Sequence, residues 1–377
     1  MKTTDSTRSE APTARIGPSM PFLPEEEALP AAPWKGLLAL LGFLLCLYAF
    51  TAPARAFVAE NRRQQFDAGV WREQNLGSYT YRPGEFQGLF LGSSRVNRGL
   101  VPEAFDLVMR KNGKPIQTLN MGNTGMGFIE MSALVDRLIE WGLGDLEWIV
   151  IELTELDPKL EASNQGSPRY NGWHSPRATR DMLAILWDSE RNWIQKIVDS
   201  YGHVIGLGAH LGGTGQAHSY WKNTYGEDRP RPPGKVARDA GYNCYPELEV
   251  VPDKPFTKVD LQLEPLPGRA PGLTPAHERI LFETDRKLRE AGVVPIFLRM
   301  PGFQRQCSAM QAAQQRLLPI TIDACEMERY QQIYKQENFH DRIHMNDTGA
   351  RQFSGILAYH VLELYRLGEL RQAPKQD

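Results

Sequence analysis

The residues whose types and spacing could perform chemistry stand in two short segments that are far apart in the chain. The first is the turn Gly92-Ser93-Ser94, which directly follows the apolar stretch FQGLFL at 86–91. A tight turn after a buried strand presents a serine hydroxyl at the carboxyl end of that strand, where open α/β sheets place their sites. Ser94 is therefore a candidate nucleophile. Gly-Ser-Ser turns are also common in ordinary loops, so the turn by itself is a weak signal.

The second segment, 340–349, holds a carboxylate three residues before a histidine, namely Asp341 and His344. This spacing lets the carboxylate accept a hydrogen bond from one imidazole nitrogen, while the other nitrogen can take a proton from a hydroxyl group. A lone Asp-x-x-His also occurs in loops that precede a helix, which Asn346 or Asp347 would cap here. Together with Ser94, the pair supplies the three groups of a Ser-His-Asp triad.

The two segments together resemble the SGNH (GDSL-like) superfamily of serine hydrolases and acyltransferases. The resemblance covers roughly residues 84–157 and 274–367. It implies that Ser94 is the nucleophile, with Ser93 where the family often has aspartate. It also implies that Asp341 and His344 complete the triad.

The resemblance further implies an oxyanion hole formed by backbone N–H groups. Ser94 supplies one donor. The segment 120–125 (NMGNTG) resembles the family motif whose glycine supplies another; the matching glycine is Gly125, with Gly122 as the alternative. Such donors, aimed at the charge that develops during acyl transfer, provide a large part of catalysis.

The third motif of the family departs from its usual form in this chain. The family carries Gly-x-Asn-Asp after its third strand, and the asparagine completes the oxyanion hole. Here the segment 152–157 reads ELTELD, so Leu156 stands at the asparagine position and cannot donate. Thr154 or Asn123 could supply the missing donor. The acidic residues of the segment are general acid–base candidates or partners for Arg95 and Arg98.

The elements that must position these residues alternate between strand and helix. Apolar segments predict five strands, at 86–91, 116–119, 148–153, 293–298 and 318–322. Helical periodicity and capping signals predict helices at 102–111, 128–141, 274–291, 326–336 and 348–367. This alternation predicts an α/β fold with a three-layer, flavodoxin-like parallel sheet of the SGNH hydrolase kind.

A large insertion, 158–273, interrupts the alternation. It is predicted to contain one amphipathic helix near 178–200 and a glycine-rich stretch at 206–215; ten prolines between Pro230 and Pro275 predict loop. The glycine spacing imitates a nucleotide-binding loop, but no strand precedes it. Four histidines in the insertion have no matching carboxylates, so neither a metal nor a cofactor is predicted: His174, His203, His210 and His218.

Charge and cysteine content exclude other classes of protein. The 377 residues include 43 Lys+Arg against 45 Asp+Glu, a formal net charge of −2, which argues against a nucleic-acid partner. Four cysteines without a Cys-x-x-Cys pair indicate neither a disulfide scaffold nor a zinc module.

The N-terminal part of the chain differs from the rest. Residues 1–35 are predicted to be a disordered tail, and 36–54, which carry no charged side chain, a transmembrane signal anchor. Residues 55–83 are predicted to be a juxtamembrane linker before the SGNH-like domain at 84–377. Arg55, Arg62 and Arg63 follow the apolar run, so the positive-inside rule does not support placing the C-terminal domain outside the cytoplasm. Two alternatives stay open for the apolar segment: a signal peptide cleaved near Ala56, after the small-residue site Ala54-Arg55-Ala56, and a buried core helix.

An anchor followed by an SGNH-like domain resembles proteins that work beside membrane-bound O-acyltransferases, such as the alginate O-acetylation proteins and the D-alanine transfer protein of teichoic acid synthesis. The resemblance implies a single-pass protein of the bacterial cytoplasmic membrane with a periplasmic domain that transfers an acyl group, acetyl above all, to a surface or secreted polysaccharide. Its partners would be the polysaccharide acceptor and a membrane-bound O-acyltransferase as acyl donor. An esterase that uses water as acceptor, and a non-catalytic scaffold protein of polysaccharide assembly, are the alternatives.

Overall fold

A computed structural model describes residues 33–50, 84–154, 172–212, 273–302, 318–341 and 343–370. Predictions on the N-terminal tail up to residue 32, the linker 55–83 and most of the insertion 158–273 lie outside the described residues. The chain divides into two units, Met1–Ala49 and Phe50–Asp377, and each is described by itself.

The first unit contains helix α1 (Pro33–Phe50), which covers most of the predicted anchor. The last four residues of the predicted span, 51–54, lie outside the described residues. Among the helices that the structure describes, none meets the length and hydropathy expected of a membrane-crossing segment.

The second unit is built on a five-stranded sheet in the order β2-β1-β3-β4-β5, with every neighbouring pair parallel. Its strands are β1 (Gly88–Leu91), β2 (Thr118–Asn120), β3 (Trp148–Glu152), β4 (Val294–Arg299) and β5 (Thr321–Asp323). The strands read as nearly continuous apolar runs because helices cover both faces of a parallel sheet. The predicted α/β class and parallel sheet are confirmed.

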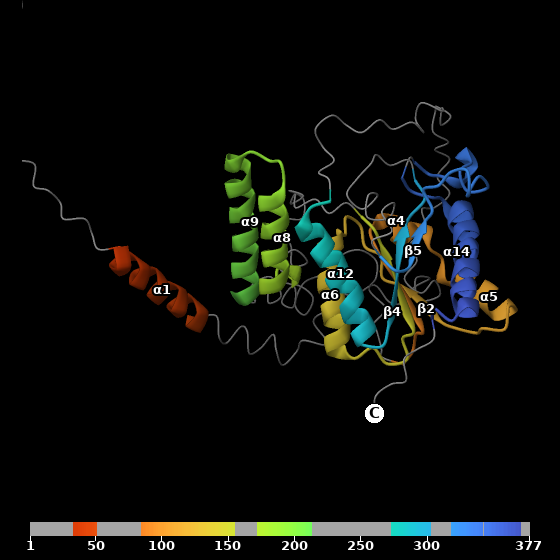
Figure 1. Cartoon of the computed structure of the whole chain (residues 1–377), viewed down its shortest axis with the longest axis horizontal. Coiled ribbons are helices and arrows are strands. Elements are labelled where there is room, and N and C mark those ends of the chain that lie inside the picture. The colour runs from red at the N-terminus through yellow and green to blue at the C-terminus, as the bar shows by residue number, and fades with distance from the viewer. Residues whose placement is uncertain are drawn as a thin grey trace, which may run out of the picture. The chain divides into compact units, whose positions relative to one another are not determined.

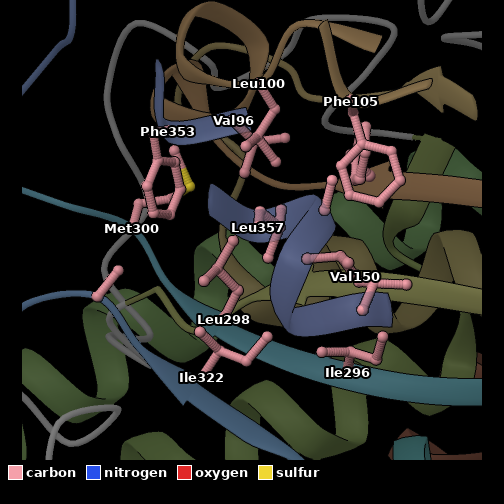
Figure 2. Packing of buried hydrophobic residues seen from close by; sticks show 14 of the residues in the cluster. Val96, Leu100, Phe105, Val150, Ile296, Leu298, Met300, Ile322, Phe353 and Leu357 are labelled. Carbon is pink, nitrogen blue, oxygen red and sulfur yellow. The ribbon is translucent and has the colours of Figure 1, made fainter. Parts of the chain in front are cut away.

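Successive side chains of β1 and β3 enter two different hydrophobic clusters, one on each face of the sheet. Leu89 and Ile149 join the cluster beneath α6 (Phe128–Trp141) and α12 (Pro275–Glu290), whereas Phe90 and Val150 join the cluster beneath α5 (Pro102–Lys111) and α14 (Asp347–Leu367). The helices stand on either side of the sheet in Figure 1. Figure 2 shows the second cluster, in which Val150 and Leu298 of the sheet lie near Phe353 and Leu357 of α14. The alternation follows from the period-two geometry of a strand.

The predicted helix boundaries agree best with those in the structure where the sequence carries a clear start signal. The helices predicted at 102–111 and 128–141 have those bounds in the structure. Thr274 caps α12 through its side chain, with Pro275 in the first turn, as predicted. Asn346 caps α14, and its side chain accepts a hydrogen bond from Gly349 N–H.

The single helix predicted near 178–200 is wrong, because the structure has two: α8 (Pro176–Asp188) and α9 (Trp193–Gly212). Polar side chains end one helix and begin the next. Ser189 Oγ donates to Leu186 O at 2.6 Å, and Asn192 Oδ1 accepts from Gln195 N–H at 2.9 Å. The glycines of the predicted glycine-rich stretch up to Gly212 lie inside α9 rather than in a loop.

The helix predicted at 326–336 is also wrong. The segment is a series of turns that ends in the 3₁₀ helix η3 (Gln336–Asn338). Tyr330 and Ile333 are both buried, which gives the segment a helical spacing of apolar residues. In a helix the carbonyls of Gln332 and Ile333 would accept from backbone N–H groups. Here the Asn338 side-chain amide donates to both of them instead.

Candidate active site

The turn that carries Ser94 is shaped by a close contact at Gly92. A Cβ atom at Gly92 would lie 2.2 Å from Val96 Cγ2 and 2.6 Å from Glu152 Oε2, so only glycine fits between β1 and the next helix. That helix, α4 (Ser94–Gly99), begins at the candidate nucleophile and is capped by the Ser93 side chain. Ser94 N–H is thus in the first turn, where backbone donors have no intrahelical acceptor.

The structure brings the three predicted triad residues together. Ser94 Oγ lies 2.8 Å from His344 Nε2, although the two residues are 250 positions apart in the chain. His344 Nδ1 lies 2.7 Å from Asp341 Oδ2. The backbone N–H groups of Ile343 and His344 both donate to Asp341 Oδ1 at 2.8 Å, which fixes the carboxylate against the imidazole. These are the contacts of a nucleophile, a base and the group that orients the base.

A short hairpin turn presents Asp341 and His344. Phe339 pairs with Met345 in an antiparallel bridge, and both side chains are buried in the core beneath α14. His340 N–H donates to His344 O at 2.9 Å within this turn. His340 and His344 are four apart, a spacing that zinc ligands on a helix share, but here they lie in a turn. Within the described ranges, no group of three or more potential ligands could hold a metal ion.

The surroundings of Asp341 favour its ionised form. Burial raises the pKa of this carboxyl group, but hydrogen bonds from His344 and from the backbone of Ile343 and His344, together with the charge of His344, outweigh burial and lower the pKa to about 2. Asp341 therefore stays a carboxylate at every pH near neutrality and holds the Nδ1–H tautomer of His344. His344 Nε2 is then available as a hydrogen-bond acceptor for Ser94 Oγ–H.

The Glu152 side chain stabilises the turn that carries Ser94. Its side chain is fully buried; Oε2 accepts from Ser93 N–H at 2.5 Å, and Oε1 lies 2.6 Å from Arg95 Nε. Of the two roles considered for Glu152, pairing with Arg95 is the one that the geometry supports. Glu155, Leu156 and Asp157 lie outside the described residues. The signal in the sequence was a carboxylate at the end of an otherwise apolar strand.

Two asparagines, Asn97 and Asn120, link the nucleophile helix to the loop after β2 by hydrogen bonds. The sequence motifs assigned no role to either side chain. Asn120 Nδ2 donates to Val96 O at 2.8 Å and to Leu100 O at 2.7 Å, while Asn120 Oδ1 accepts from Gly122 N–H at 2.8 Å. Asn97 Nδ2 donates to Gly122 O at 3.0 Å. A polar residue at the end of a buried strand was the only signal that could have marked Asn120.

These contacts separate the two glycines considered for the oxyanion hole. The N–H of Gly122 is already engaged by Asn120. Gly125 lies in a turn at φ +68°, in the left-handed region that favours glycine, and its N–H has no hydrogen-bond partner among the described residues. The geometry therefore favours Gly125, together with Ser94, as the backbone donor.

Two buried side chains near this loop lack hydrogen-bond partners within the described part of the chain: the Asn123 amide and the Thr154 hydroxyl. Asn123 N–H donates to Gly92 O at 2.8 Å, which places Asn123 beside the nucleophile turn. Asn123 O accepts from Met126 N–H and closes the turn that contains Gly125. Buried polar groups are nearly always satisfied, so the Asn123 amide stands out among the buried groups beside the nucleophile turn.

The histidines of the insertion take no part in the triad. His174 and His203 are buried and lie 3.2 Å apart between Nε2 and Nδ1, and the Trp173 ring stacks on His174. His210 lies on α9, and His218 lies outside the described residues. This cluster packs α9 onto the rest of the insertion.

No protein-family model, curated protein or solved structure matches the chain.

Proposed function

We propose that this protein is a serine-dependent acyltransferase of the SGNH kind that is anchored in the bacterial cytoplasmic membrane and acts on a polysaccharide outside it. The observation that carries the proposal is the chain of contacts Ser94–His344–Asp341 at the carboxyl edge of a parallel sheet. The strand order 2-1-3-4-5 is the flavodoxin-like order. Its layering supports the SGNH-type fold.

The geometry supports an acylation step by nucleophilic catalysis. His344 Nε2 takes the proton of Ser94 Oγ as the oxygen attacks the carbonyl carbon of an acyl donor. The negative charge passes to the carbonyl oxygen, where the N–H groups of Ser94 and Gly125 stabilise it. When the bond to the leaving oxygen breaks, His344 gives its proton to that oxygen, and an ester to Ser94 remains.

Transfer then repeats these events in reverse with a new nucleophile. A sugar hydroxyl of the polysaccharide loses its proton to His344 and attacks the acyl-enzyme carbonyl. The Ser94–acyl bond breaks, the proton returns to Ser94 Oγ, and the acylated sugar leaves. Asp341 stabilises the imidazolium in both halves without becoming protonated itself. A membrane-bound O-acyltransferase would supply the acyl group.

Hydrolysis is the second candidate, because Ser94 is partly exposed and water can therefore reach the nucleophile. Water would replace the sugar hydroxyl in the second step, and every other role would be unchanged. Comparing the rates of ester cleavage with and without an oligosaccharide acceptor separates the two. A rate increase together with an acylated oligosaccharide supports transfer; an unchanged rate with free acid as the product supports an esterase.

A fluorophosphonate probe tests the nucleophile directly. We expect the wild-type protein to be labelled and Ser94→Ala to be unlabelled, while Ser93→Ala, a matched change at the neighbouring serine, is still labelled. Circular dichroism establishes that each variant is folded. Absence of labelling in a folded wild-type preparation would contradict the proposal and favour a non-catalytic scaffold.

A further inference from the structure

Helix α9 has its polar and apolar residues on the opposite sides from those expected of a water-exposed helix. Its Lys, Asp and His side chains, Lys196, Asp199, His203 and His210, are all at least partly buried. Its exposed positions are apolar with a single polar exception, Gln195. A surface helix of a soluble domain normally shows the reverse pattern.

The exposed side chains form one continuous surface, which we call the α9 apolar face: Ile194, Ile197, Val198, Tyr201, Val204 and Ile205, each between 51% and 67% exposed. Their spacing of three and four places them along one side of the helix. Trp193 extends the face at one end and is 67% exposed. The face contains no charged group.

The opposite side of α9 packs against the rest of the protein. α9 packs on α8, and α8 in turn packs on α6 and α12, so that α9 is the outermost helix of this group in Figure 1. His203 contacts His174, and a Cβ at Gly206 would lie 2.7 Å from the His174 ring. Asp199 pairs with Arg191. These contacts fix which side of α9 faces outward.

We propose that the α9 apolar face docks onto the surface of a lipid bilayer, with α9 lying in the plane of the interface. Interfacial helices bind membranes in this way, by burying an apolar side at the boundary between the headgroups and the acyl chains. Trp187 and Trp193 flank the turn between α8 and α9 and are 53% and 67% exposed, and tryptophan is the residue that concentrates at membrane interfaces.

One feature of the chain favours lipid over other occupants. The same chain carries the charge-free apolar stretch 36–50, and a bilayer that holds this stretch would keep α9 at a high effective concentration near the surface. The proposal does not depend on the chemistry of Ser94.

The test uses the full-length protein with vesicles of phosphatidylcholine and phosphatidylglycerol that contain a lipid with a photoreactive acyl chain. After illumination, mass spectrometry of the peptides locates the adducts. We expect adducts on the α9 apolar face and none at Phe282 of α12 or Tyr359 of α14, exposed apolar residues that serve as internal controls. Adducts confined to 36–50, adducts spread equally over the controls, or failure to bind vesicles would overturn the proposal.

A matched pair of variants separates docking from folding. In Ile194→Gln/Val198→Gln/Ile205→Gln we expect loss of the α9 adducts, with adducts at 36–50 retained. In Phe282→Gln/Tyr359→Gln, the α9 adducts should persist. Both variants change exposed side chains, so their unfolding temperatures should stay close to that of the wild type. Cross-links between the α9 helices of two copies, in place of lipid adducts, would assign the face to self-association and reject the lipid surface.

Discussion

At the residue scale, the Asn123 amide is the group whose surroundings are least explained by packing. It is buried, both its polar atoms lack partners among the described residues, and it lies in the same turn as Gly125. Since Leu156 cannot donate, Asn123 is the side chain best placed to act as the third oxyanion donor.

We therefore expect Asn123→Ala to lower kcat for hydrolysis of p-nitrophenyl acetate by about 10²–10³-fold, the usual cost of removing one oxyanion donor. Thr154→Val removes the other orphaned group with little change of shape, and it should change kcat by less than about tenfold. A larger loss of kcat in Thr154→Val than in Asn123→Ala would assign the role of third oxyanion donor to Thr154. Unfolding curves of both variants serve as the control for stability.

Asp341 predicts a defined dependence on pH. Its pKa in the folded protein is about 2, below the ordinary value of 3.8. The stability that this lowered pKa contributes is therefore fully present above about pH 4 and is lost as the pH falls through about 2. Thermal unfolding of the wild type and Asp341→Asn should differ above pH 4, and the difference should shrink towards pH 2.

The same substitution tests the role of the carboxylate in catalysis. Asp341→Asn should lower kcat by about 10⁴-fold at neutral pH, because an amide at this position favours the wrong tautomer of His344. No loss of activity between about pH 8 and pH 5 should arise from protonation of Asp341 in the wild type. A variant that keeps wild-type kcat would show that His344 is oriented by other groups.

At the scale of elements, the site depends on how α4 is held against the loop after β2. The Asn120 side chain is fully buried; it donates to Val96 O in α4 and to Leu100 O directly after α4, and it accepts from Gly122 N–H of the loop. An aspartate at this position would keep the acceptor for Gly122 N–H but would face Val96 O and Leu100 O with an oxygen. The nucleophile helix and the loop after β2 would then keep the hydrogen bond from Asn97 to Gly122 O but lose those from Asn120.

Asn120→Asp should accordingly lower the free energy of unfolding in urea by about 1–3 kcal/mol, because Val96 O keeps its hydrogen bond from Leu100 N–H but Leu100 O loses the one from Asn120. It should also slow fluorophosphonate labelling of Ser94. Asn112→Asp is the matched control, since Asn112 also donates to a helix carbonyl, Val108 O, but is exposed. Equal effects of the two substitutions would contradict the proposed fastening role.

At the scale of the whole molecule, one sheet lies between two hydrophobic cores and contributes side chains to both. Leu288 of α12 and Leu357 of α14 are fully buried, on opposite faces of this sheet. The same sheet forms one wall of both cores, so loss of either core would expose apolar side chains of the strands that the other core packs against. The unit should therefore unfold cooperatively.

Leu288→Ala and Leu357→Ala test this cooperativity. Each should lower the free energy of unfolding by about 2–5 kcal/mol. Both should shift the same transition, whether it is followed by circular dichroism or by tryptophan fluorescence. Two separate transitions, each sensitive to only one variant, would show that the layers unfold independently.

Elements with strong local signals could be predicted from the sequence, and those that depend on side-chain contacts could not. Pro102 and Thr274 mark helix starts that the structure confirms. The break between α8 and α9 depends on Ser189 and Asn192, whose capping role competes with helical periodicity across the same residues. In the segment before η3, buried Tyr330 and Ile333 imitated a helix.

By itself, the sequence determined the class of sheet, the positions of its strands and the candidates Ser94, Asp341 and His344, because apolar runs, turns and caps are local properties of the chain. Only the tertiary structure decided that Ser94 and His344 meet, that Glu152 and Asn120 hold the nucleophile helix, and that α9 turns its apolar residues outward. Each of these depends on contacts between residues distant in the chain. Periodicity gives the faces of a helix but not what packs against them.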